Sequence, residues 1–226
     1  MIRDRRFAIF FRGLGFSVAL IGLLLHINVF GGKFAPGLLM YYTIQSNLLA
    51  LVLFGLLLFR TVKGYLQEGK YGKTGYFARF EMVCVVDLLV TLIVYWTLLA
   101  PGAFSMSENA KLWSFGNLSV HLFTPLLCLI DYILFAESGS LKYSDVYAIL
   151  IFPLSYVAFS TVAGFSGYIY RTSSIDGSPV RFPYFFMDYD QLGLRAILYI
   201  GGLIAAFLVL SHAFYFLDRK WKKRAL

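Results

Sequence analysis

The sequence predicts an all-α membrane protein, a six-transmembrane-helix bundle with both termini cytoplasmic. The first observation is composition: 59% of the 226 residues are apolar and only 14% are charged, whereas about a quarter of a soluble domain is charged. The second is that the apolar residues gather in six segments, each near the roughly 20 residues that one crossing of a bilayer requires. The third is the placement of the basic residues, which indicates the orientation.

The six apolar segments use most of the chain, so we expect a single six-helix membrane domain over residues 1–226. Helices are expected because backbone polar groups in lipid must be satisfied within their own segment. Strands of a membrane barrel would instead alternate polar and apolar residues. The approximate bounds of the expected helices are Phe7–Phe30, Leu38–Phe59, Phe80–Leu99, Leu118–Phe135, Tyr147–Ala163 and Arg195–Tyr215.

Lysine and arginine residues are distributed unequally between the two sides of this arrangement. Fifteen of them lie in the N-terminal stretch, the second and fourth loops and the C-terminal tail. The other side holds four, namely Lys33, Lys111, Arg171 and Arg181. Because cytoplasmic loops carry the basic excess, the termini and the Arg60–Arg79 loop are predicted to be cytoplasmic. The net charge of +8 then reports topology and contact with membrane lipids, and no nucleic-acid partner is expected.

The sequence carries no signature of a cofactor. The two cysteines, Cys84 and Cys128, fall inside apolar segments and are expected to be small core residues. There is no phosphate loop, dinucleotide fingerprint, His-Glu-x-x-His motif or Gly-x-Ser-x-Gly elbow. We therefore expect neither a metal nor another cofactor, and nothing in the sequence indicates the oligomeric state.

Polar residues gather near the outer ends of the second and fourth helices. Thr43, Ser46 and Asn47 share one helix face, and Thr43 lies about 8 Å below the outer end. His121 lies about 5 Å below the outer end of its own helix, at nearly the same depth, and His26 could join the same layer. A hydroxyl and an imidazole can act as nucleophile and general base. Helix packing is the alternative for each of these residues, and for His26 we favour it.

Pro125 should disturb the helix around His121. A proline has no N–H, so the carbonyl of the residue four positions earlier, which is His121, loses its helical partner. A kink and a polar backbone group beside the imidazole are expected. Ser46, Asn47 and Asn117 are candidate donors to a developing oxyanion in this layer.

A second polar layer is expected toward the cytoplasm. Arg12, Asp87 and Asp131 lie about 8, 10 and 6 Å from their inner helix ends, and opposite charges at similar depth favour a structural ion-pair network. A proton or ion path is the alternative. Glu81 and His212 lie nearer the helix ends, where solvated side chains are expected.

The loop over Gly164–Leu194 is long for a bundle connection and rich in tyrosine and phenylalanine. Long loops of this kind are often lids or binding loops. Aromatic residues also form belts at the membrane interface. Both interpretations remain open from the sequence.

Three motifs resemble the androgen-induced membrane protein family, including its short bacterial members. They are Tyr42-Thr43-Ile44-Gln45-Ser46-Asn47, then His121 with Thr124-Pro125, and finally Phe182-Pro183-Tyr184 through Asp188. The length and the six-helix layout match as well, so the resemblance spans nearly the whole chain.

This resemblance implies an intramembrane threonine hydrolase that cleaves fatty acid esters of hydroxy fatty acids or similar long-chain esters. It assigns the nucleophile to Thr43 and its histidine partner to His121, and it implies a lipid ester as the substrate. The similarity to bacterial members implies a bacterial plasma membrane, and the orientation predicted from the basic residues places the active site toward the outer leaflet. It supplies neither the oxyanion donors nor the group that orients the histidine.

Two other functions fit the same residues. A small transporter could use Asp87, Asp131 and Arg12 to carry protons or ions. A lipid-binding scaffold without catalysis would use Thr43 and His121 for packing alone. The sequence does not specify the natural ester or its acyl-chain length.

Overall fold

The computed structural model describes residues 1–31, 34–101, 112–173 and 176–225. Two of the basic residues used to predict the orientation, Lys33 and Lys111, lie outside these ranges. Within them, six helical stretches are long and apolar enough to cross a membrane. The predicted fold class, an all-α bundle of six such helices, is therefore confirmed.

Three of the six spans are single helices and three are interrupted. The single helices are α1 (Arg5–His26), α2 (Tyr42–Glu68), which follows the 3-10 helix η1 (Pro36–Met40), and α11 (Arg195–Ala225). The third span continues from α3 (Ala78–Val94) into the π-helical η2 (Tyr95–Leu99). The fourth consists of α6 (Phe115–Leu118), the π-helical η3 (Ser119–Phe123) and α7 (Thr124–Phe135), and the fifth of α8 (Asp145–Ala148) and α9 (Ile151–Phe165).

The expected bounds differ most where a helix continues beyond its apolar part. We expected the second and sixth helices to end at Phe59 and Tyr215, but α2 runs to Glu68 and α11 to Ala225. Hydropathy detects only the part that suits lipid, whereas helical hydrogen bonding continues through polar residues such as Lys63 and Lys220. The first helix ends earlier than expected, at His26, two residues before Asn28 takes a left-handed φ of 59°.

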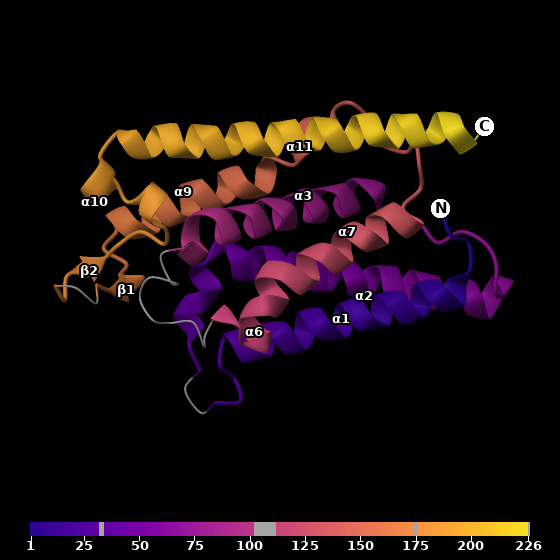
Figure 1. Ribbon diagram of the computed structural model, residues 1–226, viewed down its shortest axis with the longest axis horizontal. Coiled ribbons are helices and arrows are strands. Elements are labelled where there is room, and N and C mark those ends of the chain that lie inside the picture. The colour runs from indigo at the N-terminus through magenta and orange to yellow at the C-terminus, as the bar shows by residue number, and fades with distance from the viewer. Residues whose placement is uncertain (32–33, 102–111, 174–175, 226) are drawn as a thin grey trace.

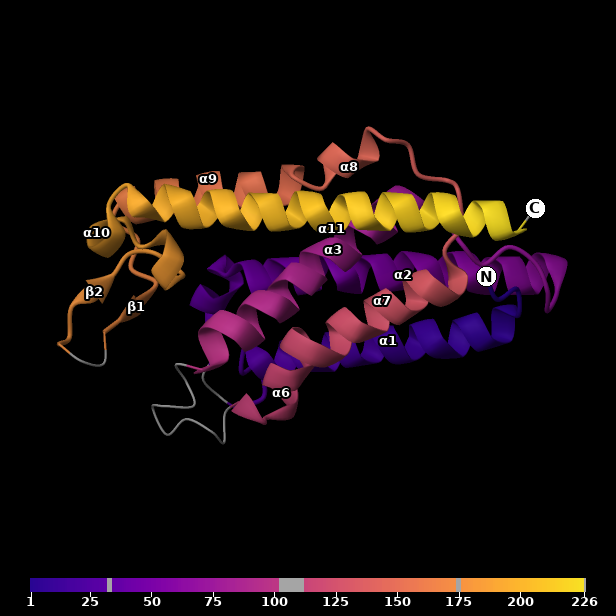
Figure 2. The same cartoon turned by 45° about the horizontal axis from the view of Figure 1, so that its top comes forward.

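The bundle has two sides of different construction (Figure 1). Helices α1, α2, α3 and α7 lie against one another, and α9 and α11 lie along another face of this group; the turned view in Figure 2 shows the same separation. Both chain ends are at one end of the bundle, which is the arrangement that six crossings require. Hereafter the inner end is the end with the termini, and the outer end is the opposite one.

The loop between α9 and α11 lies at the outer end and has local structure of its own. It contains the hairpin of β1 (Arg171–Thr172) and β2 (Pro179–Val180), the 3-10 helix η4 (Phe185–Met187) and α10 (Tyr189–Leu192). Its side chains Phe182, Phe186 and Met187 are buried against residues of α9 and α11. The loop therefore folds back onto the bundle.

Small residues let the fourth span approach α1. A Cβ at Gly22 of α1 would lie 2.2 Å from the Ser119 Cβ, and one at Gly116 would lie 3.0 Å from the backbone nitrogen of His26. Only a residue without a side chain fits such distances. These contacts bring the outer end of α1 against the segment that carries His121.

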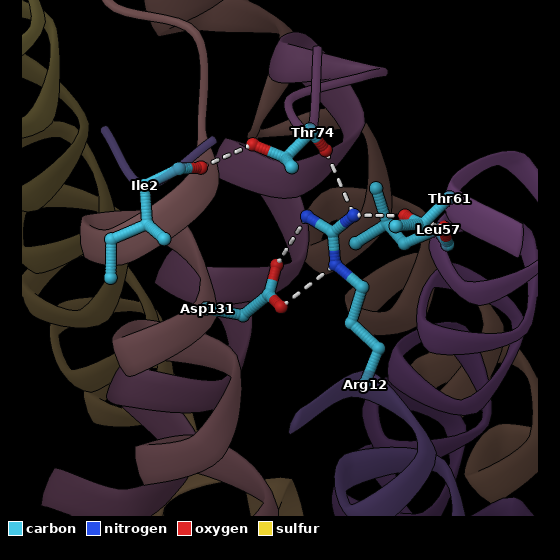
Figure 3. A network of polar contacts seen from close by, with 6 residues as sticks. All are labelled: Ile2, Arg12, Leu57, Thr61, Thr74 and Asp131. Carbon is cyan, nitrogen blue, oxygen red and sulfur yellow. Dashed lines mark hydrogen bonds and ion pairs between the residues drawn. The ribbon is translucent and has the colours of Figure 1, made fainter. Parts of the chain in front are cut away.

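The inner polar layer contains a hydrogen-bonded network around Arg12 (Figure 3). The Arg12 guanidinium donates to both carboxylate oxygens of Asp131, at 2.9 and 3.1 Å, to the Thr61 hydroxyl at 2.6 Å and to the Thr74 carbonyl at 2.8 Å. The Thr74 hydroxyl in turn donates to the Ile2 carbonyl. Four segments of the chain are thereby held to one buried cation.

Two expectations for this layer require correction. Asp87 does not join the Arg12 network, since its carboxylate accepts a hydrogen bond from Tyr42 at 2.9 Å. Glu81 is not a solvated end residue: its side chain is buried, and neither carboxylate oxygen has a hydrogen-bond partner among the described residues. Depth along a helix was predicted from the sequence, but the direction of each side chain around the helix depends on its neighbours.

Candidate active site

The residues predicted for the outer layer lie at the outer end, around two π-helical segments. His121 belongs to η3 and Tyr95 to η2. A π-helical turn inserts one extra residue per turn and recurs at functional sites. Here two such turns face each other in neighbouring spans, and their side chains meet.

His121 is fixed in position on several sides. Its ring stacks on Tyr95 with centroids 3.5 Å apart, and the His26 ring lies edge-on at 5.7 Å. Its Nδ1 lies 3.1 Å from the Asn117 carbonyl. Because a carbonyl only accepts, Nδ1 carries the proton in a neutral ring, and the Nε2 lone pair is left to accept another. The group that orients the histidine, which the sequence did not identify, is thus a backbone carbonyl of its own helix.

The expected effect of Pro125 on the His121 carbonyl is present in the structure. The helix passes through the π-helical η3 directly before Pro125. The His121 carbonyl accepts a hydrogen bond from the Trp96 indole N–H at 3.1 Å. The polar backbone group that the proline releases therefore ties the fourth span to the third.

Thr43 lies on the wall of an apolar cavity, which we call the outer cavity. It is a space of about 70 Å³ between the head of α2, the outer half of α3, α9, α11 and the loop before α11. Its lining is almost entirely aliphatic and aromatic, with Thr43 and Thr91 as its two aliphatic hydroxyls. One water needs roughly 10–15 Å³ of such space. The cavity can therefore admit a small group beside the Thr43 hydroxyl.

Tyr184 is a functional candidate to which the sequence assigned no role of its own. Its ring lines the outer cavity and stacks on Phe186, and its hydroxyl lies beside the side chain and backbone of Thr43. Burial raises the pKa of Tyr184 to about 12, although the neighbouring Thr43 acts to lower it. The phenol thus keeps its proton at neutral pH. The signal in the sequence was its place in the aromatic loop, which contributes Tyr184, Phe186 and Met187 to the cavity wall.

The three side chains expected to donate to an oxyanion are engaged elsewhere. Ser46 and Asn47 both donate to the Thr43 carbonyl, at 3.0 and 2.8 Å. Asn117 donates to the Tyr95 hydroxyl at 2.8 Å and to the Leu112 carbonyl at 2.9 Å. Ser46 and Asn47 thereby hold the backbone of Thr43, and Asn117 holds the Tyr95 ring on which His121 stacks. None is recorded as donating into the outer cavity.

Asn47 joins the Thr43 and His121 parts of the layer. Its amide nitrogen bridges the carbonyl of Thr43 and that of Val120, at 2.8 and 3.0 Å. Val120 directly precedes His121, so one side chain fixes the nucleophile candidate relative to the base candidate. Within the described residues, no hydrogen bond between the Thr43 hydroxyl and the His121 ring is recorded.

Comparison with known proteins adds no relative from which a role could be transferred. No family model, no curated protein and no solved structure matches this chain.

Proposed function

We propose that the protein is an intramembrane hydrolase of long-chain lipid esters, with Thr43 as the nucleophile and His121 as the general base. The observation that carries the proposal is the position of one threonine hydroxyl. Thr43 opens onto an apolar cavity between membrane helices. The Asn47 amide links its carbonyl to that of Val120, and the next residue is the buried His121, whose Nε2 is left as a proton acceptor. The resemblance to the androgen-induced family of threonine hydrolases points to the same two residues.

The reaction proceeds in two steps. His121 Nε2 takes the proton of the Thr43 hydroxyl while its oxygen attacks the ester carbonyl carbon, and the bond to the leaving alcohol breaks as His121 returns the proton to it. Water then attacks the acyl-threonine with His121 again as base, which releases the acid and restores the hydroxyl. The mechanism therefore requires proton transfer between the two groups through one bridging water or after a rotation of the Thr43 side chain.

Charge that develops on the carbonyl oxygen needs a donor near Thr43. Thr43 is the second residue of α2, so its backbone N–H has no acceptor within the helix and lies at the positive end of the helix dipole. The Tyr184 hydroxyl now lies against that N–H, and an entering carbonyl oxygen takes its place there. The phenol stays beside the carbonyl oxygen, so that the backbone N–H and the phenol donate to the oxyanion together.

The surroundings favour a lipid over a soluble substrate. The cavity wall consists of apolar side chains such as Val94, Leu203 and Phe207, which suits an acyl chain. With the termini cytoplasmic, as the basic residues predict, the site belongs to the outer leaflet of a bacterial plasma membrane.

The orientation has its own test. Both native cysteines are buried, so single introduced cysteines can be labelled selectively with a membrane-impermeant maleimide. Arg171→Cys in the exposed hairpin should react in intact cells, and Lys70→Cys only after lysis. The reverse pattern would show that the site faces the cytoplasm.

A covalent intermediate tests the mechanism directly. Purified protein incubated with an activated long-chain ester should carry an acyl group on the peptide that contains Thr43, as measured by mass spectrometry. Thr43→Ala should lose this adduct, and His121→Ala should form it far more slowly. Thr97→Ala, which alters an exposed threonine near the same end, is the matched control and should label like the wild type.

Hydrolysis at the wild-type rate by folded Thr43→Ala would contradict the proposal. If Asp87→Asn also abolished a proton-coupled flux in proteoliposomes, the carrier function would replace it.

A further inference from the structure

A second, larger space lies along the same two helices as the outer cavity. This inner groove of about 670 Å³ is bounded by Phe80 and Val83 of α3 on one side and by Ala148, Ile151 and Phe152 of the fifth span on the other. The outer cavity is bounded farther along by Thr91 and Val94 of α3 and by Tyr156 and Val157 of α9. The two spaces therefore follow one another along a single seam between α3 and the fifth span.

The seam is open because α9 is loosely packed. Among the described residues, the backbone of α3 lies close to those of α2, α7 and α11 but approaches α9 at few points. Side chains hold α9 in place, through the Tyr156 hydroxyl on the Met40 carbonyl at 3.2 Å and through its aromatic contacts. Helices that meet only through long side chains leave room between their backbones.

Two rings separate the outer cavity from the inner groove. Tyr42 lines the cavity, Phe152 lines the groove, and their ring centroids lie 5.1 Å apart. Tyr42 is anchored by its hydrogen bond to the buried Asp87. Phe152, in contrast, is only partly buried and lies in the first turn of α9. A rotation of Phe152 about χ1 would therefore join the two spaces while Tyr42 stays in place.

We propose that the outer cavity and the inner groove form one acyl-chain channel, with Phe152 as the movable gate between them. This rests on the proposed function: the ester lies at Thr43, and its acyl chain runs inward past Phe152. Thr91 and Phe80 are eleven residues apart on α3, which is about 16 Å of helix. The channel therefore selects a long acyl chain, because a short one leaves the groove unfilled.

The inner end of the channel is polar and sets its length. Lys73 pairs with Glu137 at 2.7 Å, and Arg79 with Asp145 at 3.4 Å, at the rim of the groove. These charges are already paired, so the rim does not call for an anionic ligand. A methyl end is accommodated by the aromatic and aliphatic wall and stops at the charged rim.

The test varies the gate and the chain length together. Phe152→Trp should raise the KM for a palmitoyl ester roughly tenfold or more relative to wild type while leaving a butyryl ester unaffected, and Phe152→Ala should lower the palmitoyl KM. Leu154→Ala is the matched control, because this side chain is exposed on the same helix and should not change chain-length preference. Equal effects of Phe152→Trp on both esters would overturn the channel.

A binding measurement keeps this inference separate from the catalytic proposal. Palmitic acid with a photoreactive diazirine at its methyl end should cross-link to residues of α3 or of the fifth span that line the inner groove, even in Thr43→Ala, and Phe152→Trp should suppress this cross-link. Cross-links on the groove that persist in Phe152→Trp would mean that chains enter from the bilayer, which refutes the gate. Loss of all ester hydrolysis activity with gated cross-linking intact would refute the catalytic proposal alone.

Discussion

The Arg12 network and the outer polar layer both consist of buried polar residues but differ in how completely those residues are satisfied. In the Arg12 network, the guanidinium donates to Asp131, to Thr61 and to a carbonyl, all within the bundle, whereas the nearby carboxylates of Glu81 and Asp87 keep oxygens without a partner among the described residues. In the outer layer, buried polar atoms remain without a recorded partner among the described residues, including the Asn47 Oδ1 and the Ser119 hydroxyl. A complete network holds helices together, whereas an incomplete one leaves groups for a ligand.

We therefore expect the Arg12 network to determine mainly the stability of the protein and the outer layer to determine mainly its activity. Removing one partner of the satisfied pair leaves a bare charge in the core. Removing a reactive group from the outer layer leaves packing largely unchanged. Substitutions in the two layers should therefore have opposite signatures, and each prediction below challenges that division.

The largest effect is expected for the proposed nucleophile and base. Thr43→Ala and His121→Ala should each abolish hydrolysis of a long-chain ester, and the double variant should be no slower than either single one, because the pair acts as a unit. Thr43→Ser should retain part of the activity, since it keeps the hydroxyl. Steady-state rates of purified, folded variants measure this. Additive losses in the double variant would show that the two residues do not act together.

The next largest effect is expected in the inner layer. Asp131→Asn leaves the buried Arg12 without a counter-charge and should lower the free energy of unfolding by about 3–5 kcal/mol. The protein that remains folded should hydrolyse ester at close to the wild-type rate. Thermal melts in detergent, together with activity per folded molecule, check both.

The control for Asp131→Asn is Asp190→Asn, which breaks the exposed pair with Arg181 in the outer loop and should melt like the wild type. An Asp131→Asn protein that melts normally but is inactive would assign the inner layer to function instead.

A smaller, mixed effect is expected at the contact between α1 and η3. Gly22→Ala places a methyl group against Ser119 and should destabilise the protein by about 1–3 kcal/mol. It should also slow hydrolysis by shifting His121. Gly13→Ala on the same helix meets open space and should be neutral or stabilising. Similar melting temperatures for the two variants would mean that the close approach is dispensable.

The smallest effect is expected from the indole that satisfies the His121 carbonyl. Trp96→Phe removes the donor of that bond and should cost about 1 kcal/mol, with a severalfold lower turnover. The measurement is a melt paired with steady-state rates, and Thr97→Ala in the same π-helical segment serves as the comparison. Unchanged turnover in Trp96→Phe would show that the carbonyl does not help to position the imidazole.

The six spans could be predicted from the sequence because a bilayer requires long apolar helices, and each such helix appears in the sequence as a long run of apolar residues. The ion pair of Arg12 with Asp131 followed from charge and depth alone. The effect of Pro125 on the His121 carbonyl followed from covalent geometry. Each of these depends on chain position and local chemistry, which a sequence contains.

Only the tertiary structure determined which side chains share a space. Asp87 has a depth that matches Arg12, yet it faces Tyr42, because direction around a helix depends on which helices surround it. Tyr184 reaches Thr43 from a loop some 140 positions away along the chain, and no local pattern encodes that return. The sequence determined what each helix carries and how deep it lies; the packing of α9 and the loop determined the cavity, since cavities arise between elements and belong to none of them.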